Sequence, residues 1–574
     1  MLAYDIYEKQ MLHYDIITKG PIPTLYDPDG IYPYESYVET VKRPRHKDYK
    51  MIEIENNFIK AVFCPDLGGK LFSLRLKSKE KEVLYDSMAV KPVRILPRMA
   101  FISGGIEVSF PISHTPSQIE KVCYQVERVD DRLYVRMGET EICHGMQWTL
   151  EFSLGEEDRF LTQRVIFNNP TNKVHPYMSW SNAAVPARED SIISYPNGRV
   201  LSHSREMSEF DWNGDKKVSD FDRMYGFFWK TTDCNAFGVY NPSLGTGLYH
   251  IADQEEASGM KLWLYGIGEE ERWAYQTSIK KESYVEIQAS SIKEQADKKE
   301  LRPYESTSRT EFWIPADQYY DIHSLKLPEV NLVPVDTVPF FPVADREKNI
   351  AWKKVCYAYE NKQMADPKII GHCNWPPCGI EGLKEALRYF SEADGDPMWK
   401  YYYALYLLAE DESNNEKAIG LLTESDIPEA YAFLGRIYRL KKQYERSLEA
   451  LMKIKDPSWS NHPQIVYERD LTLEKFKDKM DLRVKYLNDI DEIKDDYIVE
   501  RRVKCLMDCG EYEMAKELLL SHKFELVHQR YDRTKMLREI LDQLGEKPVL
   551  CVPQNIGEDE LATYGAYRIN EEGA

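Results

Sequence analysis

Three segments place acids and histidines inside apolar, strand-like sequence, where an unpaired charge is costly. The first is RILPRMAFISGGIEVSFPISH at 94–114. Its glycine pair allows a tight backbone turn before Glu107, and His114 closes the segment. Glu107 is therefore a candidate catalytic acid. The alternative is a structural ion pair between Glu107 and an arginine such as Arg98.

The second segment is VHPYMSWSNAAVPARED at 174–190, which contains His175, Trp180 and Asn182. Strand alternation places His175 on one face with Ser181, and Trp180 and Asn182 on the other face, unless a bulge resets the order. His175 is a candidate catalytic residue, although histidines in strands are more often structural. Trp180 and Asn182 are candidate substrate-binding residues.

The third segment is LWLYGIGEEERWAYQTSIKKESYVEIQAS at 262–290. Trp263 and Trp273 offer flat faces on which a sugar ring can stack. Glu286 lies in the middle of an apolar strand, and desolvation raises the pKa of a carboxyl group in such a place. A raised pKa suits general acid or base catalysis near neutral pH. Gln288 shares the face of Glu286.

The region around these segments predicts a large antiparallel β-sandwich. Short runs alternate apolar and polar residues and are separated by turn residues, with no alternating β-α pattern and no dinucleotide fingerprint. The predicted boundaries are 1–45 for an N-terminal lead-in, 46–325 for the β-sandwich, 326–350 for a proline-rich linker, 351–548 for helical repeats and 549–574 for a C-terminal tail. We expect the linker to pack as an extended strap.

The segment EAYAFLGRIYRLKKQYERSLEALMKIKDP at 429–457 resembles a tetratricopeptide repeat (TPR), and 499–522 is a weaker copy. Such helix pairs bury their apolar faces by stacking on their neighbours. The repeats leave a protein partner or self-association open.

Composition favours a neutral small molecule as substrate. The 574 residues carry a net charge of −20, so no basic excess exists to neutralise nucleic acid or an anionic membrane. The 39 Tyr and 11 Trp suit stacking on sugars, although aromatic residues also fill sandwich cores. The closest cysteine pairs, Cys373/Cys378 and Cys505/Cys509, lack zinc-site spacing, so we expect no metal and no cofactor.

Localisation follows from what the sequence lacks. The residues MLAYDIYEKQMLHYDI hold no apolar run of signal-peptide length, and no stretch reaches the roughly 18–20 apolar residues of a membrane span. The sequence therefore predicts a cytoplasmic protein with reduced thiols and no membrane partner.

The GG-x-E, W-S-N-A-A-V-P and G-x-G…RW…Y-x-E-x-Q segments together resemble DUF5107, a domain of unassigned function that is often joined to TPRs. More distantly, CPDLGGKLFSL at 64–74, KVHPYM at 173–178 and YVEIQ at 284–288 resemble aldose 1-epimerases. The resemblance implies a multidomain β + α protein, in which a galactose-mutarotase-like antiparallel β-supersandwich precedes an α-helical TPR-like repeat domain.

The epimerase resemblance also implies residue roles. Glu286 matches the base at the anomeric hydroxyl, and His175 matches the acid at the ring oxygen. Arg98 and His114 lie about where that family places its substrate-binding arginine and second histidine. Val174 stands where the family usually has an asparagine, and Glu107 is not an epimerase feature.

Three functions are open at this stage. The favoured one is a glycoside hydrolase that acts on small oligosaccharides or glycosides, because Glu107 and Glu286 supply the two carboxyl groups that hydrolysis requires. The second is an epimerase-type isomerase that uses Glu286 and His175. The third is a non-catalytic sugar sensor or scaffold whose repeats bind a partner. The fold alone does not decide between them.

Overall fold

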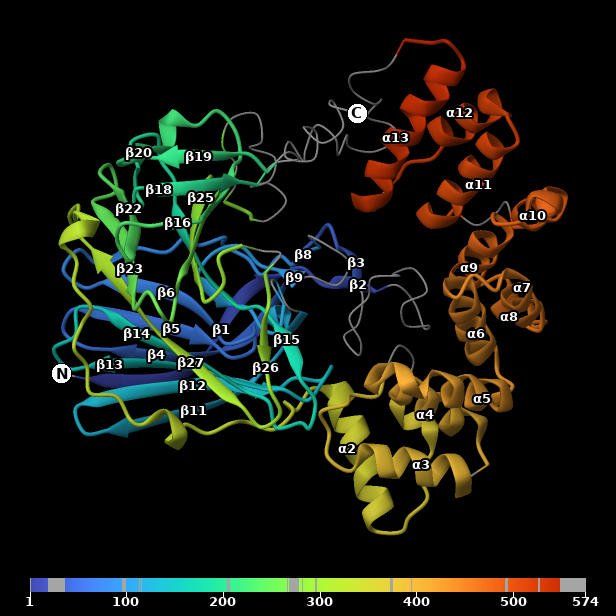
Figure 1. Cartoon of the computed structure of the whole chain (residues 1–574), viewed down its shortest axis with the longest axis horizontal. Helices are drawn as coiled ribbons and strands as arrows, with labels where there is room; N and C mark the ends of the chain where they lie inside the picture. Colours follow the sequence, from blue (N-terminus) through green and yellow to red (C-terminus); the bar gives the residue numbers. More distant parts are fainter. Residues whose placement is uncertain are drawn as a thin grey trace. The chain divides into compact units, whose positions relative to one another are not determined.

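The computed structural model describes residues 2–18, 37–94, 100–112, 114, 116–203, 207–265, 267, 278–280, 282–294, 297–371, 375–393, 395–490, 494–524 and 527–547. The chain divides into two compact units (Figure 1). One is β-rich and takes in Thr40–Arg346 together with the first strand. The other holds the helices from Glu347 onward together with Ile17–Glu39.

The larger sheet of the β-rich unit has 12 strands among the described residues. In order across the sheet they are β1 (Ala3–His13), β4 (Arg45–Glu55), β5 (Ile59–Cys64), β6 (Lys70–Leu76), β10 (Ile106–Val108), β16 (Trp180–Pro186), β25 (Tyr284–Ser290), β24 (Gly259–Tyr265), β21 (Gly226–Trp229), β18 (Gly198–Ser202) and β19 (Glu209–Trp212), with β7 (Lys81–Glu82) beside β6.

The smaller sheet has nine strands in the described part of the chain. Its order is β11 (Cys123–Val129), β12 (Arg132–Thr140), β13 (Gln147–Gly155), β14 (Leu161–Asn168), β27 (Ser306–Ala316), β23 (Thr246–Ala252), β22 (Ala236–Asn241), β17 (Ile192–Ser194) and β20 (Lys216–Lys217). Two-stranded ladders join β15 (His175–Tyr177) to β26 (Lys299–Leu301), β2 (Ile16–Thr18) to β3 (Tyr37–Thr40), and β8 (Val93–Arg94) to β9 (Ala100–Phe101).

The core lies between the two large sheets and follows the two-residue period of the strands. Ala183 and Val185 of β16 share one apolar cluster with Phe152 and Trp313 of the smaller sheet. A fully buried valine or phenylalanine side chain, such as Val185 or Phe152, contributes roughly 1.5–3 kcal/mol to stability. The alternate residues of β16, such as Asn182, therefore lie on the face of the larger sheet that points away from this core.

The glycine pair of the first motif turns the chain into β10. Gly104 and Gly105 have φ values of +88° and +67°, a region that favours glycine. A Cβ atom would lie 2.5 Å from the Tyr85 carbonyl oxygen at Gly104, and 2.4 Å from the Leu71 carbonyl oxygen at Gly105. Only glycine can therefore occupy these two positions. The tight turn that the pair makes leads into β10, where Glu107 pairs with Asn182 of β16.

The proline-rich segment lies as an extended strap on the outer face of the smaller sheet. Side chains of the sheet donate to its carbonyl groups: Thr149 Oγ1 to Pro339 at 2.9 Å, Thr140 Oγ1 to Phe341 at 2.7 Å, and Arg164 Nη1 to Val333 at 2.7 Å. Side-chain donors are needed because these strands already use their backbone groups in ladders.

The helical unit consists of short α-helices joined by turns. They are α2 (Glu347–Glu360), α3 (Leu383–Ala393), α4 (Pro397–Glu410), α5 (Asn415–Ser425), α6 (Pro428–Leu440), α7 (Tyr444–Met452), α8 (Pro457–Ser460), α9 (Pro463–Leu473), α10 (Met480–Asn488), α11 (Asp496–Asp508), α12 (Tyr512–Ser521) and α13 (Val527–Gln543). Several begin with proline, which is favourable at the first helical position because it needs no donor there.

The repeat motif explains how α6 packs on α7. A Cβ atom at Gly435 would lie 2.6 Å from Leu451 Cγ, so the small residue lets the two helices approach closely. Ser447 Oγ donates to the Gly435 carbonyl oxygen at 2.7 Å. These are positions that the sequence motif singled out.

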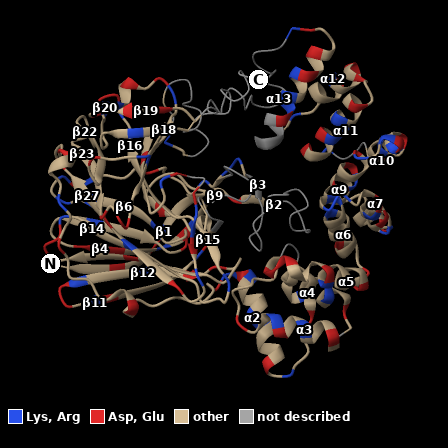
Figure 2. Cartoon of the chain, in the orientation of Figure 1, with Lys and Arg blue, Asp and Glu red and all other residues tan. Residues whose placement is uncertain are grey.

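Three features concern the described residues as a whole. No described helix is both long and apolar enough to cross a bilayer. The eight cysteines in the described part of the chain are all free thiols. Acidic and basic residues are interspersed over both units in the view of Figure 2, so the acidic excess is not confined to one block.

Candidate functional site

A row of polar side chains crosses four strands of the larger sheet on the face away from the core. The ladders pair Glu107 of β10 with Asn182 of β16, Asn182 with Gln288 of β25, and Gln288 with Lys261 of β24. All four are at most 4% exposed. Glu286 lies two residues before Gln288 and shares its face.

Glu107 is an ionised carboxylate held by neighbouring side chains. His114 Nδ1 lies 3.0 Å from its Oε1 atom, and Asn182 Nδ2 donates to the same oxygen at 3.0 Å. Burial alone would raise the pKa of Glu107, but the His114 contact, the Lys70 charge and the Asn182 hydrogen bond outweigh it and lower that pKa. Glu107 is therefore charged at neutral pH.

Glu286 is in the opposite state. Burial first, and then repulsion from the Glu107 charge, raise the pKa of Glu286 far above that of an ordinary carboxyl group. Lys261, Lys70 and a 2.9 Å hydrogen bond from Gln288 Nε2 oppose the shift without cancelling it. Glu286 therefore holds a proton near neutral pH and can donate it.

Two buried lysines flank the acids. Lys70 Nζ donates to the Ile102 carbonyl oxygen at 2.5 Å. Lys261 Nζ instead lies 5.2–5.4 Å from the ring centroids of Phe228, Trp263 and Trp180, a cation–π arrangement. Burial lowers the pKa of Lys261. Glu286 opposes that shift only once it has lost its own proton, whereas the Glu107 charge opposes it throughout.

Aromatic side chains surround the polar row. The Trp263 ring lies 5.8 Å from Tyr265, and Tyr265 stacks on Tyr284 with ring centroids 4.8 Å apart. Phe101 meets His114 edge-on at 5.3 Å. Trp263 is half-buried, so one aromatic edge of the site is accessible. Such faces suit the apolar side of a sugar ring.

Several buried polar atoms of this face have no partner within the described protein. They are Glu107 Oε2, Asn182 Oδ1, Gln288 Oε1, Trp180 Nε1 and Trp263 Nε1. A native structure rarely leaves such atoms unsatisfied, and each one is costly. Their concentration beside the acid pair indicates a site for a ligand that offers both hydroxyl donors and acceptors.

The structure brings together most of the predicted site residues. Glu107, His114, Trp180, Asn182, Trp263, Glu286 and Gln288 all lie on or beside the polar face. His175 does not join them: it lies on β15, which pairs with β26 in a separate sheet. Arg98 and Trp273 lie outside the described residues.

His175 has its own local surroundings. Its ring stacks on His144 at 5.1 Å, and its Nε2 lies 3.0 Å from Thr171 Oγ1. Burial and the neighbouring His144 lower the pKa of His175 to about 4. The expected alternation with Trp180 and Asn182 fails because the strand is interrupted between β15 and β16.

The sequence patterns did not predict Lys70 and Lys261 as residues of this polar face. Both lie in apolar strand segments, GGKLFSL and GMKLWLY, and the cost of a charge in such sequence was the signal that identified Glu107. The same criterion applied to lysine would have found them.

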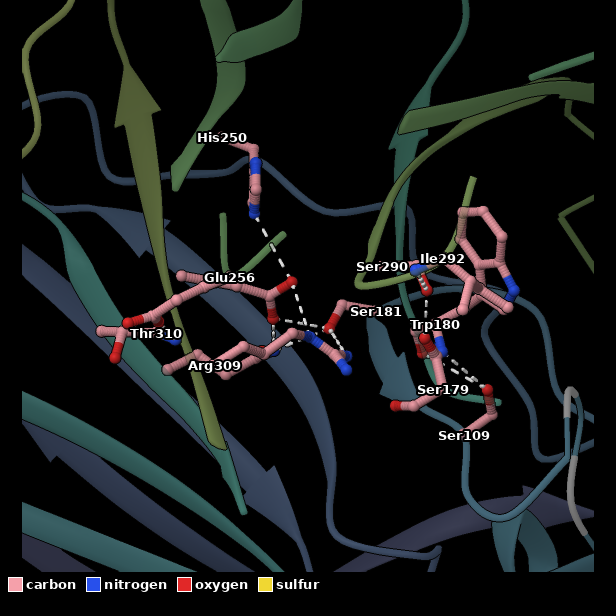
Figure 3. A network of polar contacts seen from close by, with 12 residues as sticks. Ser109, Ser179, Trp180, Ser181, His250, Glu256, Ser290, Ile292, Arg309 and Thr310 are labelled. Atoms are coloured by element: carbon pink, nitrogen blue, oxygen red, sulfur yellow. Dashed lines mark hydrogen bonds and ion pairs between the residues drawn. The ribbon is translucent and has the colours of Figure 1, made fainter. Parts of the chain in front are cut away.

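The opposite face of β16 carries a second buried network (Figure 3). Ser181 Oγ donates to Glu311 Oε2 at 2.6 Å, and Arg309 Nη2 donates to Ser181 Oγ at 3.0 Å. His250 Nε2 lies 3.7 Å from Glu311 Oε1. Burial would raise the pKa of Glu311, but Arg309, His250 and Ser181 lower it to about 2. This network lies between the sheets, so we assign it to stability.

Two other features are less suited to chemistry. Ligand atoms of Asp233, Cys234 and His323 lie within 4.8 Å of one another, as in a metal site. Asp233 and His323 are well exposed, however, and they already contact each other at 3.3 Å.

A cavity of about 610 Å³ beside the strap is lined by Asp253, Glu256 and residues 327–332, and its lining residues include no basic group.

Comparison with known families decides the affiliation of the chain. The family DUF5107, a domain of unknown function, matches residues 26–316. A second family, described as a C-terminal domain, matches residues 352–540. The chain belongs to the DUF5107 family.

Among similar solved structures, one matches almost the whole chain. A TPR-domain containing protein from Parabacteroides distasonis ATCC 8503 is 43% identical, with a TM-score of 0.90 over 97% of this chain and 98% of that one. A galactose mutarotase-like protein from Clostridium acetobutylicum is 14% identical (TM-score 0.36; 47% of this chain, 96% of that one). Another from Lactobacillus casei ATCC 334 is 12% identical (TM-score 0.35; 46% and 99%).

These findings and the sheet topology confirm two predictions: membership of DUF5107, and an antiparallel β-sandwich followed by TPR-like helices. They leave the reaction and the site residues of this DUF5107 protein as proposals.

Proposed function

We propose that this DUF5107 protein is a carbohydrate-active enzyme, most specifically a glycoside hydrolase for small glycosides. One observation carries the proposal: two buried carboxyl groups on one sheet face have pKa values shifted in opposite directions. Hydrolysis of a glycosidic bond needs one protonated acid for the leaving oxygen and one ionised carboxylate. Glu286 supplies the first and Glu107 the second.

The strand geometry supports this pairing. Glu107 and Glu286 are two strands apart and two residues out of register, which puts their Cα atoms about 12 Å apart at ordinary strand spacing and rise. Because both side chains lie on one face, this is compatible with the carboxyl separation of about 5–10 Å found in glycosidases. Asn182 and His114 orient Glu107 through their contacts with its Oε1 atom.

The isomerase alternative paired Glu286 with His175. His175 contacts His144 and Thr171 instead. It lies on the β15–β26 ladder, whereas Glu286 lies on β25 of the larger sheet. We therefore favour the acid pair over that alternative.

The test is the release of reducing sugar from a panel of aryl-glycosides and natural oligosaccharides by the purified full chain. We expect a bell-shaped pH dependence of kcat/KM. Its acid limb reports protonation of Glu107 and lies below the usual carboxyl range, while its basic limb reports loss of the Glu286 proton and lies well above that range. No release from any member of the panel at any pH would contradict the proposal.

Gly226 provides a test of whether a sugar stacks on the Trp263 ring. A Cβ atom there would lie 2.1 Å from the Trp263 ring, so Gly226→Ala must displace the indole. We expect about tenfold weaker sugar binding, because stacking on the ring is lost. Calorimetric titration measures it, with Gly420→Ala as the control, since a Cβ atom at Gly420 meets nothing within 4 Å. Unchanged affinity in Gly226→Ala would remove Trp263 from the site.

A further inference from the structure

Lys261 is a buried cation with no anionic partner in the described structure. It is 4% exposed, and three aromatic rings surround its ammonium group. Among the described residues, no carboxylate lies within ion-pair distance of Nζ and no acceptor is hydrogen-bonded to it. Aromatic rings recover only part of the cost of burying such a charge.

The ionisable groups near Lys261 either have bonded partners or are uncharged near neutral pH. Glu107 is held by His114 and Asn182, and Lys70 is bonded to a backbone carbonyl. Glu286 keeps its proton near neutral pH because burial raises its pKa. Lys261 is therefore the one positive group of the described polar face that lacks a bonded partner, and the unpaired polar atoms of the site lie beside it.

We propose that the sugar bound on this face carries a carboxylate, as a uronic acid does, and that Lys261 Nζ pairs with it. The inference rests on the proposed function, because it specifies the substrate of the same site. A single unpaired cation matches a monoanion better than a dianionic phosphate ester, whose second charge the ionised Glu107 would repel.

The pairing has a pH signature. Burial lowers the pKa of Lys261, and a carboxylate beside it favours the charged form. Affinity for a uronate should therefore fall as pH rises through the range in which Lys261 loses its proton and Glu286 becomes charged, while affinity for the matching neutral sugar should fall much less. The described titratable groups that face Lys261 are Glu286 on β25, Glu107 on β10, Lys70 on β6 and His203.

The test compares matched ligands by calorimetric titration of the full chain: glucuronate against glucose, galacturonate against galactose, and glucose 6-phosphate as the phosphate arm. We expect the preferred uronate to bind at least about tenfold more tightly than its neutral counterpart. Lys261→Met should remove that preference, so that the variant binds a uronate and its neutral counterpart with affinities within about threefold of each other. Lys216→Met is the control, because Lys216 also lies over an indole, that of Trp212, but on strand β20.

Three results would overturn the inference: equal binding of acidic and neutral sugars, a preference for the phosphate ester, or a uronate preference that survives in Lys261→Met. If Lys261→Met does not fold, Lys261→Gln decides instead, by the same comparison of ligands. If neutral sugars bind and uronates bind no more tightly, this inference fails while the proposed function stands. If no sugar binds, the proposed function fails as well.

Discussion

Glu286→Gln is expected to lower kcat about 10³-fold while making the protein more stable above neutral pH. The amide keeps the shape of the side chain but has no acidic proton to give, and general acid catalysis contributes about 10²–10⁴-fold. Sugar release by the variant beside the unaltered chain measures the loss. Glu107→Gln should lose activity comparably, because the ionised carboxylate is then missing.

The stability gain follows from the sign of the pKa shift. The folded pKa of Glu286 is raised, so its contribution to stability is fully present below the unfolded pKa of about 4.3. That contribution is lost as pH rises toward the folded pKa, because the unfolded chain releases the proton more readily. A glutamine has no proton to lose, so we expect a gain of about 1–3 kcal/mol at pH 8 by calorimetric unfolding.

Two results would contradict this account of Glu286. One is full activity in Glu286→Gln. The other is a variant that becomes less stable relative to the unaltered chain as pH rises, because this would mean that the buried carboxyl group is ionised and paired.

Glu311→Gln is expected to cost about 3–5 kcal/mol of stability. Glu311 is fully buried, and its negative charge compensates Arg309 between the two sheets. The amide leaves the Arg309 charge buried without its partner. The matched control is Glu127→Gln, in which a 44%-exposed carboxylate pairs with Arg136 and should contribute no more than about 1 kcal/mol.

The pH dependence provides a second readout for Glu311. Its folded pKa is lowered to about 2 by Arg309, His250 and Ser181, which outweigh burial. The stability that it contributes is present above the unfolded pKa of about 4.3 and is lost as pH falls through the folded value. Acid unfolding of the unaltered chain should be steeper in this window than that of Glu311→Gln. Equal slopes of acid unfolding for the unaltered chain and Glu311→Gln would refute the structural role of Glu311. An equal loss of stability in Glu311→Gln and Glu127→Gln would refute it as well.

The sequence predicted the fold because its patterns are local. The two-residue period indicates strands, and the helix-pair motif around Gly435 indicates repeats whose packing the structure reproduces. It also singled out Glu107 and Glu286 as candidates, because an acid in apolar strand sequence is costly unless it is used or paired, and the structure places both on one sheet face.

Contacts between distant segments could not be predicted in this way. Asn182 holds Glu107 across 75 residues of sequence, and this contact depends on the register of β10 with β16. The interruption before β16 separates His175 from the face that the alternation implied. Tertiary packing, rather than residue type, decided these positions.

The most direct test of the central claim is the protonation state of the two acids, which can be measured before the substrate is known. Infrared difference spectra at neutral pH would compare the unaltered chain with Glu286→Gln and with Glu107→Gln. We predict that the protonated-carboxyl band is lost in Glu286→Gln and retained in Glu107→Gln, and that in the unaltered chain it fades only in alkaline solution. A band that is unchanged in Glu286→Gln would show that Glu286 is ionised, and would contradict the division of roles between the two acids.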